Sequence, residues 1–298
     1  MMKRLAVPLL LTGTLALAAC GAEEPADSPS ANTPTPAELL TKAITESSDQ
    51  KSAAFSLTAS VTGASDDPQV QPFLEKPLKA EISGKASPKA VDITGKATVS
   101  GRDFQLGVRA DEQQSFIQFM NTWYGPDDGI TGATGSTSTD PAELKQTLLK
   151  MRQYANDVLK GEVTEGDEVD GQKTWQFEGT LNPDGIVKVA QAEGEPMSAD
   201  DQNALRALAP LIKLRFATGQ EDGLFRLVGV DFKLTEAQIK TLDALSDGDP
   251  FPLKALSVNM TLKISDYGTP VTIEAPADPQ PTDALGGALV GALLSMSG

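Results

Sequence analysis

Alternation of apolar and polar residues along the chain is the feature that most limits how this sequence can fold. It is clearest at residues 55–61, and it returns at 78–82, 91–99 and 104–110. Successive side chains of a strand point to opposite faces, so each segment predicts a strand with one apolar and one polar face. The connecting segments are short and rich in turn residues. Together they predict an antiparallel meander.

Helices and further strands are predicted around this meander. Four segments combine a capping residue with apolar residues at helical spacing: 35–48, 140–161, 198–210 and 235–245. Further strands are predicted at 115–125, 162–168, 173–181, 211–219, 223–234 and 256–265. A short last strand is predicted after a turn at 267–268, and it ends at Pro276. This mixture predicts an α+β domain in which a curved antiparallel sheet surrounds helices.

The N-terminus has the organisation of an export signal. Lys3 and Arg4 precede an apolar run at 5–17, and small residues lead to Cys20, which predicts a signal peptide at 1–19. The run LAAC at 17–20 resembles the lipobox of bacterial lipoproteins. That resemblance implies a diacylated or triacylated Cys20 (palmitate or a similar chain) at the start of the mature protein. The apolar run is short for a membrane span, whereas two or more acyl chains anchor a protein stably. A plain secretory peptide with a chance cysteine, or a short membrane anchor, are the alternatives.

Composition excludes several classes of function. The net charge of -16 becomes more negative once the signal leaves with Lys3 and Arg4, so nucleic acid is not an expected partner. The chain has no histidine and a single cysteine, which rules out Ser-His-Asp and Cys-His catalysis and any internal disulfide. Adjacent acids lie at turns or helix starts, at 127–128, 200–201 and 221–222. We therefore predict no enzyme, no metal site and no cofactor.

The mature chain is expected to have three parts. Residues 20–36 are the lipidated cysteine and a disordered tether of Pro, Ser, Thr and acidic residues. Residues 37–281 are expected to form the folded domain. Residues 282–298 are an apolar tail rich in Gly and Ala, in which Leu285 to Met296 are expected to form a short helix docked on the domain. A frayed C-terminus is the alternative.

Several of these features together resemble a known family. They are the lipobox, the capped first helix, the strand end TWYG at 122–125 and the closing motif DYGTPVTIEAP at 266–276. They resemble the LppX/LprG lipoproteins, relatives of the LolA/LolB lipoprotein-carrier superfamily, over about residues 36–281. The resemblance implies a half-barrel fold that holds a lipid between sheet and helices. The tail at 283–298 and the loop at 125–139 depart from the family pattern.

The apolar strand faces are the candidate binding site. Aromatic residues make up only 5% of the chain, and many inward positions carry Ala, Val or Gly, which favours a weakly filled interior. The expected cavity-lining residues are Phe55, Leu57, Ile82, Ile93, Phe104, Leu106, Phe116, Trp175 and Phe177. An acyl chain in such a cavity gains about 0.8 kcal/mol per buried methylene group.

The prediction is therefore a lipoprotein on the extracytoplasmic face of the cell membrane that binds or carries a lipid or another apolar molecule. The membrane contact is the acyl anchor on Cys20, and the sequence names no protein partner. The alternative is a non-catalytic structural or interaction lipoprotein. In that case the same side chains form a filled core, and a surface binds another protein.

Overall fold

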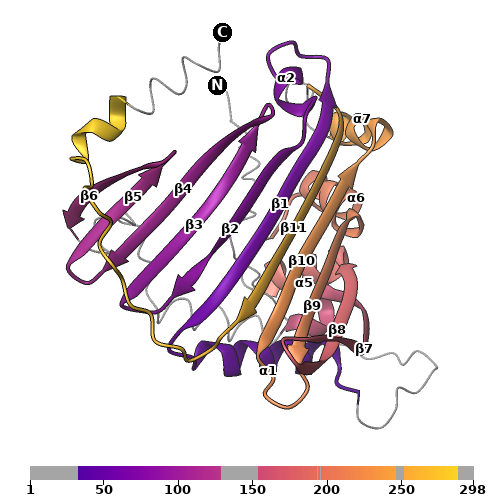
Figure 1. The fold of residues 1–298 in the computed structure, drawn as a ribbon. Coiled ribbons are helices and arrows are strands. Elements are labelled where there is room, and N and C mark those ends of the chain that lie inside the picture. Colours follow the sequence, from indigo (N-terminus) through magenta and orange to yellow (C-terminus); the bar gives the residue numbers. More distant parts are fainter. Residues whose placement is uncertain (1–32, 129–153, 193, 195, 246–251, 288–298) are drawn as a thin grey trace. The chain divides into compact units, whose positions relative to one another are not determined.

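The computed structural model describes residues 33–128, 154–192, 194, 196–245 and 252–287. They form an α+β fold whose eleven-stranded antiparallel sheet has the order β6-β5-β4-β3-β2-β1-β11-β10-β9-β8-β7 and is not closed (Figure 1). The predicted fold class is confirmed. The chain divides into two compact units, with residues 1–48, 63–71 and 139–259 in the first and 49–62, 72–138 and 260–298 in the second.

The second unit is mainly a meander of neighbouring strands (Figure 1). Its strands are β1 (Ala53–Ser65, of which the last residues belong to the first unit), β2 (Leu78–Ala86), β3 (Ala90–Val99), β4 (Arg102–Asp111), β5 (Gln114–Phe119) and β6 (Thr122–Asp128). The turn between β3 and β4 has positive φ angles at Ser100 (51°) and Gly101 (81°), as a tight hairpin requires. The predicted meander is therefore confirmed.

The first unit combines strands with most of the described helices. It contains α1 (Pro36–Ser48), β7 (Leu159–Val169), β8 (Gln172–Leu181), α5 (Pro183–Ala192), α6 (Ala199–Leu208), η1 (Ala209–Leu211), β9 (Ile212–Gly219), β10 (Phe225–Leu234) and α7 (Glu236–Leu245). α2 (Gln71–Leu74) and β11 (Leu253–Ser265) continue into the second unit. α5 packs on α6 and α6 on α7, while α1 lies against β7 and β10 (Figure 1).

Local hydrogen bonds explain where three of these helices begin. At α1 the Thr35 side chain accepts from Glu38 N–H at 3.2 Å, and the Glu38 side chain accepts from Thr35 N–H at 2.8 Å, which is a capping box. Ser198 Oγ accepts from Asp201 N–H at 3.1 Å before α6. Thr235 N–H donates to Gln238 Oε1 at 2.8 Å before α7. The predicted helix starts are confirmed at all three places.

Aromatic side chains fill the core of the first unit. Phe177 on β8 is fully buried and stacks on Phe216 of β9, with ring centroids 4.9 Å apart. Phe225 of β10 meets Phe216 edge-on at 6.2 Å. Leu39 of α1 closes this cluster. The predicted apolar stripe of the first helix therefore packs on the sheet.

Three predictions about individual elements are wrong, and one helix was not predicted. Gly161 does not stop a helix but lies in β7 opposite Gly179, where an added Cβ would come within 2.6 Å of Gly179 Cα. The single strand expected at 115–125 is two strands, because the chain reverses at Met120, whose φ is 56°. The turn at 267–268 is present, but no strand follows it before Pro276. α5 was not predicted, because its start reads as a turn.

Candidate functional site

A row of alanines crosses one face of the second unit. Ala59 of β1 pairs with Ala80 of β2, Ala80 pairs with Ala97 of β3, and Ala97 pairs with Phe104 of β4. Paired residues project from the same face of a sheet, so three methyl groups lie side by side and Phe104 closes the row. We call this row of small side chains, with the larger apolar residues on either side of it, the alanine trough.

Larger apolar residues border the alanine trough on both sides. One flanking row consists of Leu57, Ile82, Gly95, Leu106 and Phe119, and the other contains Val61 and Leu78. Most of these side chains are half-buried, and Leu106 is 41% exposed. The longer helices α1, α5, α6 and α7 belong to the first unit. This face is therefore apolar but only partly covered by the described residues.

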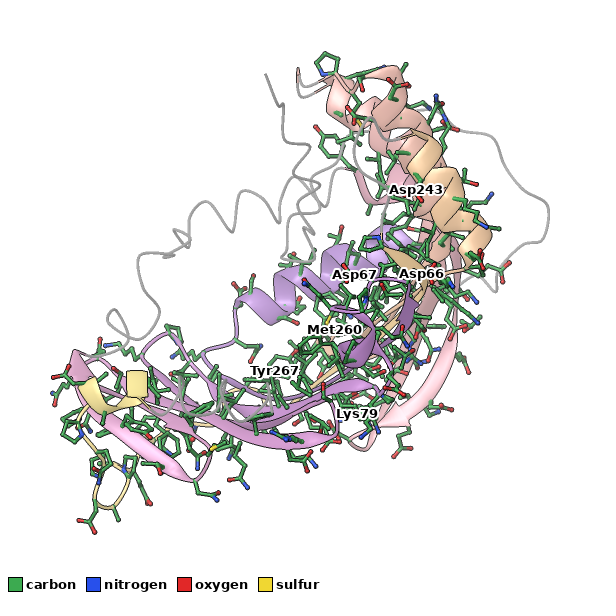
Figure 2. All side chains as sticks on the ribbon, turned by 90° about the horizontal axis from the view of Figure 1, so that it is seen from above. Asp66, Asp67, Lys79, Asp243, Met260 and Tyr267 are labelled. Atoms are coloured by element: carbon green, nitrogen blue, oxygen red, sulfur yellow. The ribbon has the colours of Figure 1, made fainter. Side chains whose placement is uncertain are left out.

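The opposite face of the same strands is polar. The residues of β2 alternate between half-buried and exposed along its whole length, and Lys79 and Glu81 are on the exposed side. Figure 2 shows side chains projecting from the strands of this unit, with Lys79 labelled. A small polar depression of about 450 Å³ lies here, and Ser56, Glu81 and Lys96 are among its lining residues. The two faces thus differ sharply in chemistry.

The nine predicted cavity residues fall into three groups. Phe55, Leu57, Ile82, Ile93, Phe104 and Leu106 share the apolar face of the second unit. Phe116 pairs with Arg109 and lies on the opposite face, 2% exposed. Trp175 and Phe177 belong to the filled core of the first unit. The structure thus brings six of the candidates together and places three elsewhere.

The segment that follows β11 wraps around the edge of this sheet, and we call residues 266–287 the edge hook. Gly268 N–H donates to Ser52 O at 2.9 Å, and Arg109 Nη1 donates to Glu274 O at 3.3 Å. At edge strand β6, Gln280 N–H donates to Trp123 O, and Gln280 O accepts from Gly125 N–H, both at 2.8 Å. These bonds hold the hook along the sheet and pair it with the edge strand.

Arg109 is the centre of the contacts on the polar face. Its Nε lies 3.2 Å from Asp92 Oδ1, and its guanidinium carbon lies 4.8 Å from the centre of the Trp123 ring. A cation over an aromatic ring and a charged hydrogen bond both orient the side chain. The arrangement fixes the guanidinium where it can reach Glu274 O. We therefore assign Arg109 a positioning role for the edge hook.

The hook ends on the apolar face. Residues 283–287 are helical, and Leu285 packs on the cluster of Phe119 and Tyr124. Phe104, at the end of the alanine trough, packs on the same cluster. The long-range bonds of Gln280 have no periodic signature in the sequence. The rest of the tail, and so most of the helix expected between Leu285 and Met296, lies outside the described residues.

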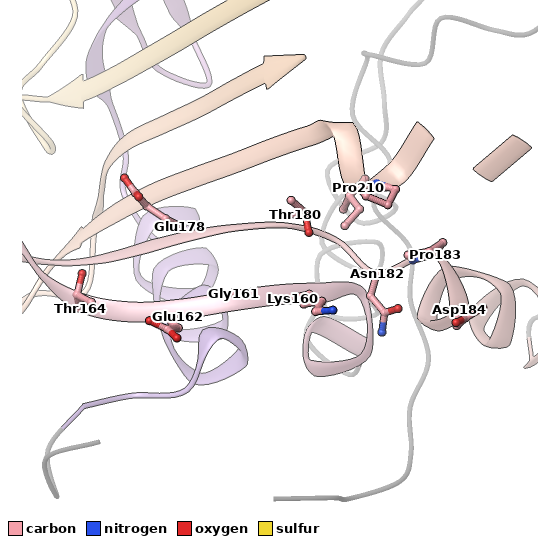
Figure 3. A pocket seen from close by; sticks show the side chains of 11 residues that line it. Lys160, Gly161, Glu162, Thr164, Glu178, Thr180, Asn182, Pro183, Asp184 and Pro210 are labelled. Atoms are coloured by element: carbon pink, nitrogen blue, oxygen red, sulfur yellow. The ribbon is translucent and has the colours of Figure 1, made fainter. Parts of the chain in front are cut away.

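A pocket in the first unit is lined mainly by polar and charged residues (Figure 3). It has about 740 Å³ and extends along β7 and β8 to the start of α5. Lys160, Glu162, Glu178 and Thr180 project into it, and Asp184 is held by Arg206 Nε at 3.0 Å. These side chains suit water and ions better than an acyl chain. Among the described residues no group of three or more metal-ligating side chains occurs.

Carboxylates with shifted pKa values in the second unit stabilise turns. The Thr98 hydroxyl, which donates to Asp103 at 2.6 Å, is the main cause of the lowered pKa of Asp103. The backbone N–H groups of Gln113 and Gln114 lower the pKa of Asp111 in the next turn. Asp103 is exposed and Asp111 is half-buried, and both lie at hairpin ends. Their shifts therefore have a structural cause.

The predicted signal peptide, the acylated cysteine and any membrane-spanning helix concern residues away from this site. Cys20 and the signal peptide lie outside the described residues. In the part of the chain that the structure describes, no helix has the length and apolar character needed to cross a bilayer.

Comparison with solved structures finds lipoproteins of similar fold. The LppX lipoprotein of Mycobacterium tuberculosis matches with 12% identity over 80% of this chain and 97% of that chain, with a TM-score of 0.39. LprF from Mycobacterium bovis matches with 14% identity over 82% and 99%, with a TM-score of 0.40. A LolA superfamily protein from Nitrosomonas europaea matches with 11% identity over 82% and 96%, with a TM-score of 0.20.

The predicted resemblance is thus confirmed as structural similarity at low sequence identity. The three descriptions are of lipoproteins and of a LolA superfamily member, and none is of an enzyme. No protein-family model and no curated protein matches the sequence.

Proposed function

We propose that this chain is a lipoprotein anchored through Cys20 on the extracytoplasmic face of the cell membrane, and that its second unit binds a lipid acyl chain in the alanine trough. The observation that carries the proposal is the pairing of Ala59, Ala80 and Ala97 between rows of larger apolar residues. Such a row is an apolar surface of small side chains, along which a linear chain can lie.

The size of the trough suits an acyl chain. Neighbouring strands lie about 4.8 Å apart, so the distance from β1 to β4 is about 14 Å. Burial of about ten methylene groups against this surface gains about 8 kcal/mol before the cost of ordering the chain. The polar headgroup stays in water at the end of the trough. Binding is therefore sequestration, in which strand side chains replace the water around the acyl chain.

Two further observations support this assignment. Phe177 and Phe216 fill the core of the first unit, which leaves the open apolar surface to the second unit. The LAAC run at 17–20 resembles a lipobox and favours a membrane anchor, which keeps the domain close to its ligand. The alternative role, a structural lipoprotein with a protein-binding surface, is one outcome of the test below.

The test introduces one large side chain into the alanine trough and leaves the rest of the sheet unchanged. Ala80→Trp places a large apolar side chain in the trough, and Lys79→Trp, the matched control, places it on the opposite, exposed face. Full-length variants in membranes are irradiated with a diazirine-bearing palmitate, and labelled peptides are mapped by mass spectrometry. We expect label between residues 53 and 110 in the unmodified chain and in Lys79→Trp, and at least fivefold less in Ala80→Trp. Equal labelling of the two variants, or no label in any chain, contradicts lipid binding and favours the structural role.

A further inference from the structure

We propose that the edge of β7 that faces away from β8 is a docking site for a basic, extended segment of a partner protein. The segment adds to the sheet as a further strand and places cationic side chains beside Glu162 and Glu165. This site lies in the first unit, so it is independent of lipid binding by the second. Three properties of β7 support it, namely its exposure, its charges and the pocket beside it.

β7 is the last strand of the sheet, and its outer edge is accessible. The strand order ends with β7 beside β8, and no bridge on the other side of β7 occurs among the described residues. The inner strand β2 alternates between half-buried and exposed residues, whereas Lys160, Gly161 and Glu162 of β7 are exposed in succession. Since Gly161 has no side chain, its exposure is exposure of the backbone. Accessible N–H and C=O groups of an edge strand can pair with an added strand.

The other end of the sheet differs, because the edge hook pairs with that edge strand. Gln280 of the hook is bonded to Trp123 and Gly125 of β6. β7, in contrast, contains no proline, so no backbone donor is missing from it. Its pairing with β8 is regular from Leu159 to Gly166, which is long enough for an added strand of ordinary length.

Acidic side chains along β7 select the charge of the added strand. The strand carries four acids and one cation, which are Glu162, Glu165, Asp167, Glu168 and Lys160. Within the ranges that the structure describes, no ion pair joins Glu162 or Glu165 to a cation. Self-pairing of β7 between two copies brings like charges together, whereas a basic segment is attracted. The charge of this edge therefore favours a basic partner over a second copy.

Glu162 has a further reason to favour a cation. It is paired with Glu178 of β8, and the Cβ atoms of directly opposite residues lie about 4.5–5.5 Å apart. Like charges in this arrangement destabilise a sheet. Glu178 is paired on its other side with Arg215 of β9, so the row across the three strands is cation, anion, anion. A cation opposite Glu162 on an added strand places a positive charge on each side of the two carboxylates.

The pocket beside this row has room for that cationic side chain. It has about 740 Å³, and Glu162 and Glu178 project into it from neighbouring strands (Figure 3). The aliphatic stem of an arginine or lysine can lie along the strand while its charged end reaches the carboxylates. On the other face of β7, Val163 packs on the aromatic core and Glu165 is paired with Trp175. The two faces of the edge therefore require different side chains.

Strand geometry then specifies the sequence of the partner segment. Glu162 and Thr164 share one face of β7, and Val163 and Glu165 share the other. An antiparallel added strand therefore presents a cation, a polar residue, an apolar residue and a second cation, in that order along its chain. A parallel strand presents the reverse order. The two cations are three residues apart and lie on opposite faces, which distinguishes strand addition from general attraction to an acidic surface.

Peptide binding to the full-length chain in a non-ionic detergent tests the site. The probe is the fluorescein-labelled peptide GSTRTVRTSG, which has the required order. The control peptide GSTRTRVTSG has the same composition but places both arginines on one face. We expect fluorescence anisotropy to show about fivefold weaker binding of the control, or weaker still, because it can pair with only one of the two glutamates.

Charge reversal locates the site on the protein. Glu162→Lys with Glu165→Lys is expected to weaken binding of the probe about tenfold or more, because two attractive pairs become repulsive. Glu75→Lys with Glu81→Lys makes the same change of charge at exposed residues of the second unit and should leave the affinity nearly unchanged. Circular dichroism of both variants verifies that they are folded. Equal loss of binding in the two variants contradicts a site at β7.

Hydrogen–deuterium exchange shows whether the peptide adds as a strand. New backbone bonds should slow the exchange of amides within residues 159–166 when the probe is bound. Slower exchange there, together with preference for the probe over the control peptide, supports the proposal. Absence of binding, equal binding of both peptides or unchanged exchange overturns it. Amides at 159–166 that are already protected in the free chain, and that the probe does not affect, show an edge covered by the chain itself or by a second copy, which overturns it as well.

Discussion

At the residue scale, Phe177 and Leu106 are both apolar strand residues, but their side chains differ in burial. Phe177 is fully buried and stacks on Phe216, whereas Leu106 is 41% exposed beside the alanine trough. A core side chain is supported by neighbours on all sides, but a side chain that borders an open site is not. Equal hydrophobicity therefore does not mean equal contribution to stability.

Phe177→Ala and Leu106→Ala should differ in how far they lower the free energy of unfolding, because Phe177 lies in a filled core and Leu106 does not. We expect Phe177→Ala to lower the free energy of unfolding by about 3–5 kcal/mol, because it leaves a cavity in a packed core. Leu106→Ala should cost less than about 1 kcal/mol, because little buried area is lost. Urea unfolding of both full-length variants, followed by circular dichroism, measures the difference. A cost for Leu106→Ala as large as that for Phe177→Ala would mean that the face beside the trough is a filled core.

At the scale of elements, the sequence predicts strands better than it predicts reversals. Burial of one face imposes alternation over many residues, so β2 and β3 are evident from their pattern. The reversal at Met120 is different, because a non-glycine residue takes a positive φ there and Asn121 is the one turn-favouring residue beside it. α5 was missed for a related reason, since its start at Pro183, Asp184 and Gly185 has the composition of a turn.

The candidate site was predictable only in part. Alternation within a strand shows which residues share a face, but it does not show which residues of neighbouring strands are paired. Leu57, Ile82 and Ile93 lie on long alternating strands, whose pattern fixes which residues share a face. The alanine trough, by contrast, depends on register between strands, which brings Ala59, Ala80 and Ala97 into one row and has no local signature. Pattern alone also does not tell a filled face from an open one, and Phe177 and Leu57 are therefore indistinguishable in the sequence.

The capping box of α1 gives this helix a pH-dependent start. The backbone N–H of Thr35, and then its hydroxyl, lower the pKa of Glu38 below its usual value of 4.5. A lowered folded-state pKa means that the carboxylate contributes fully above its unfolded pKa and loses this contribution as pH falls through the folded one. We expect Thr35→Ala to cost about 1 kcal/mol at pH 7, with Thr35→Ser as a nearly neutral control.

Thermal unfolding at several pH values measures this dependence. The difference in midpoint between the unmodified chain and Glu38→Gln should be largest near pH 7 and should shrink as pH falls below the usual pKa of Glu38. The glutamine retains an acceptor oxygen but no charge, so it isolates the ionised form. A difference that stays constant down to pH 2 would exclude a role for the ionised carboxylate.

On the scale of the whole molecule, two unlike units and a strongly acidic surface suit a protein tethered to a membrane without lying on it. The net charge of -16 opposes contact with anionic headgroups, so the surface itself provides no attraction to them. In the proposed function, attachment then depends on the acyl anchor on Cys20. The filled first unit supplies a stable body, and the second supplies the apolar face.

Cys20→Ala is therefore expected to release the protein from the membrane or to leave its precursor unprocessed. Lipoprotein processing acts on the cysteine at the end of the LAAC run, and two or more acyl chains give anchoring that one chain does not. Fractionation should find the unmodified chain with membranes, and its N-terminal peptide should carry the mass of the acyl groups on Cys20. Ala19→Ser, which keeps a small residue before the cysteine, is the matched control and should remain anchored. Because the acidic surface offers no second attachment, membrane association that survives Cys20→Ala, with no acyl mass on the unmodified chain, would show that the apolar run at 5–17 is a membrane anchor and that Cys20 is incidental.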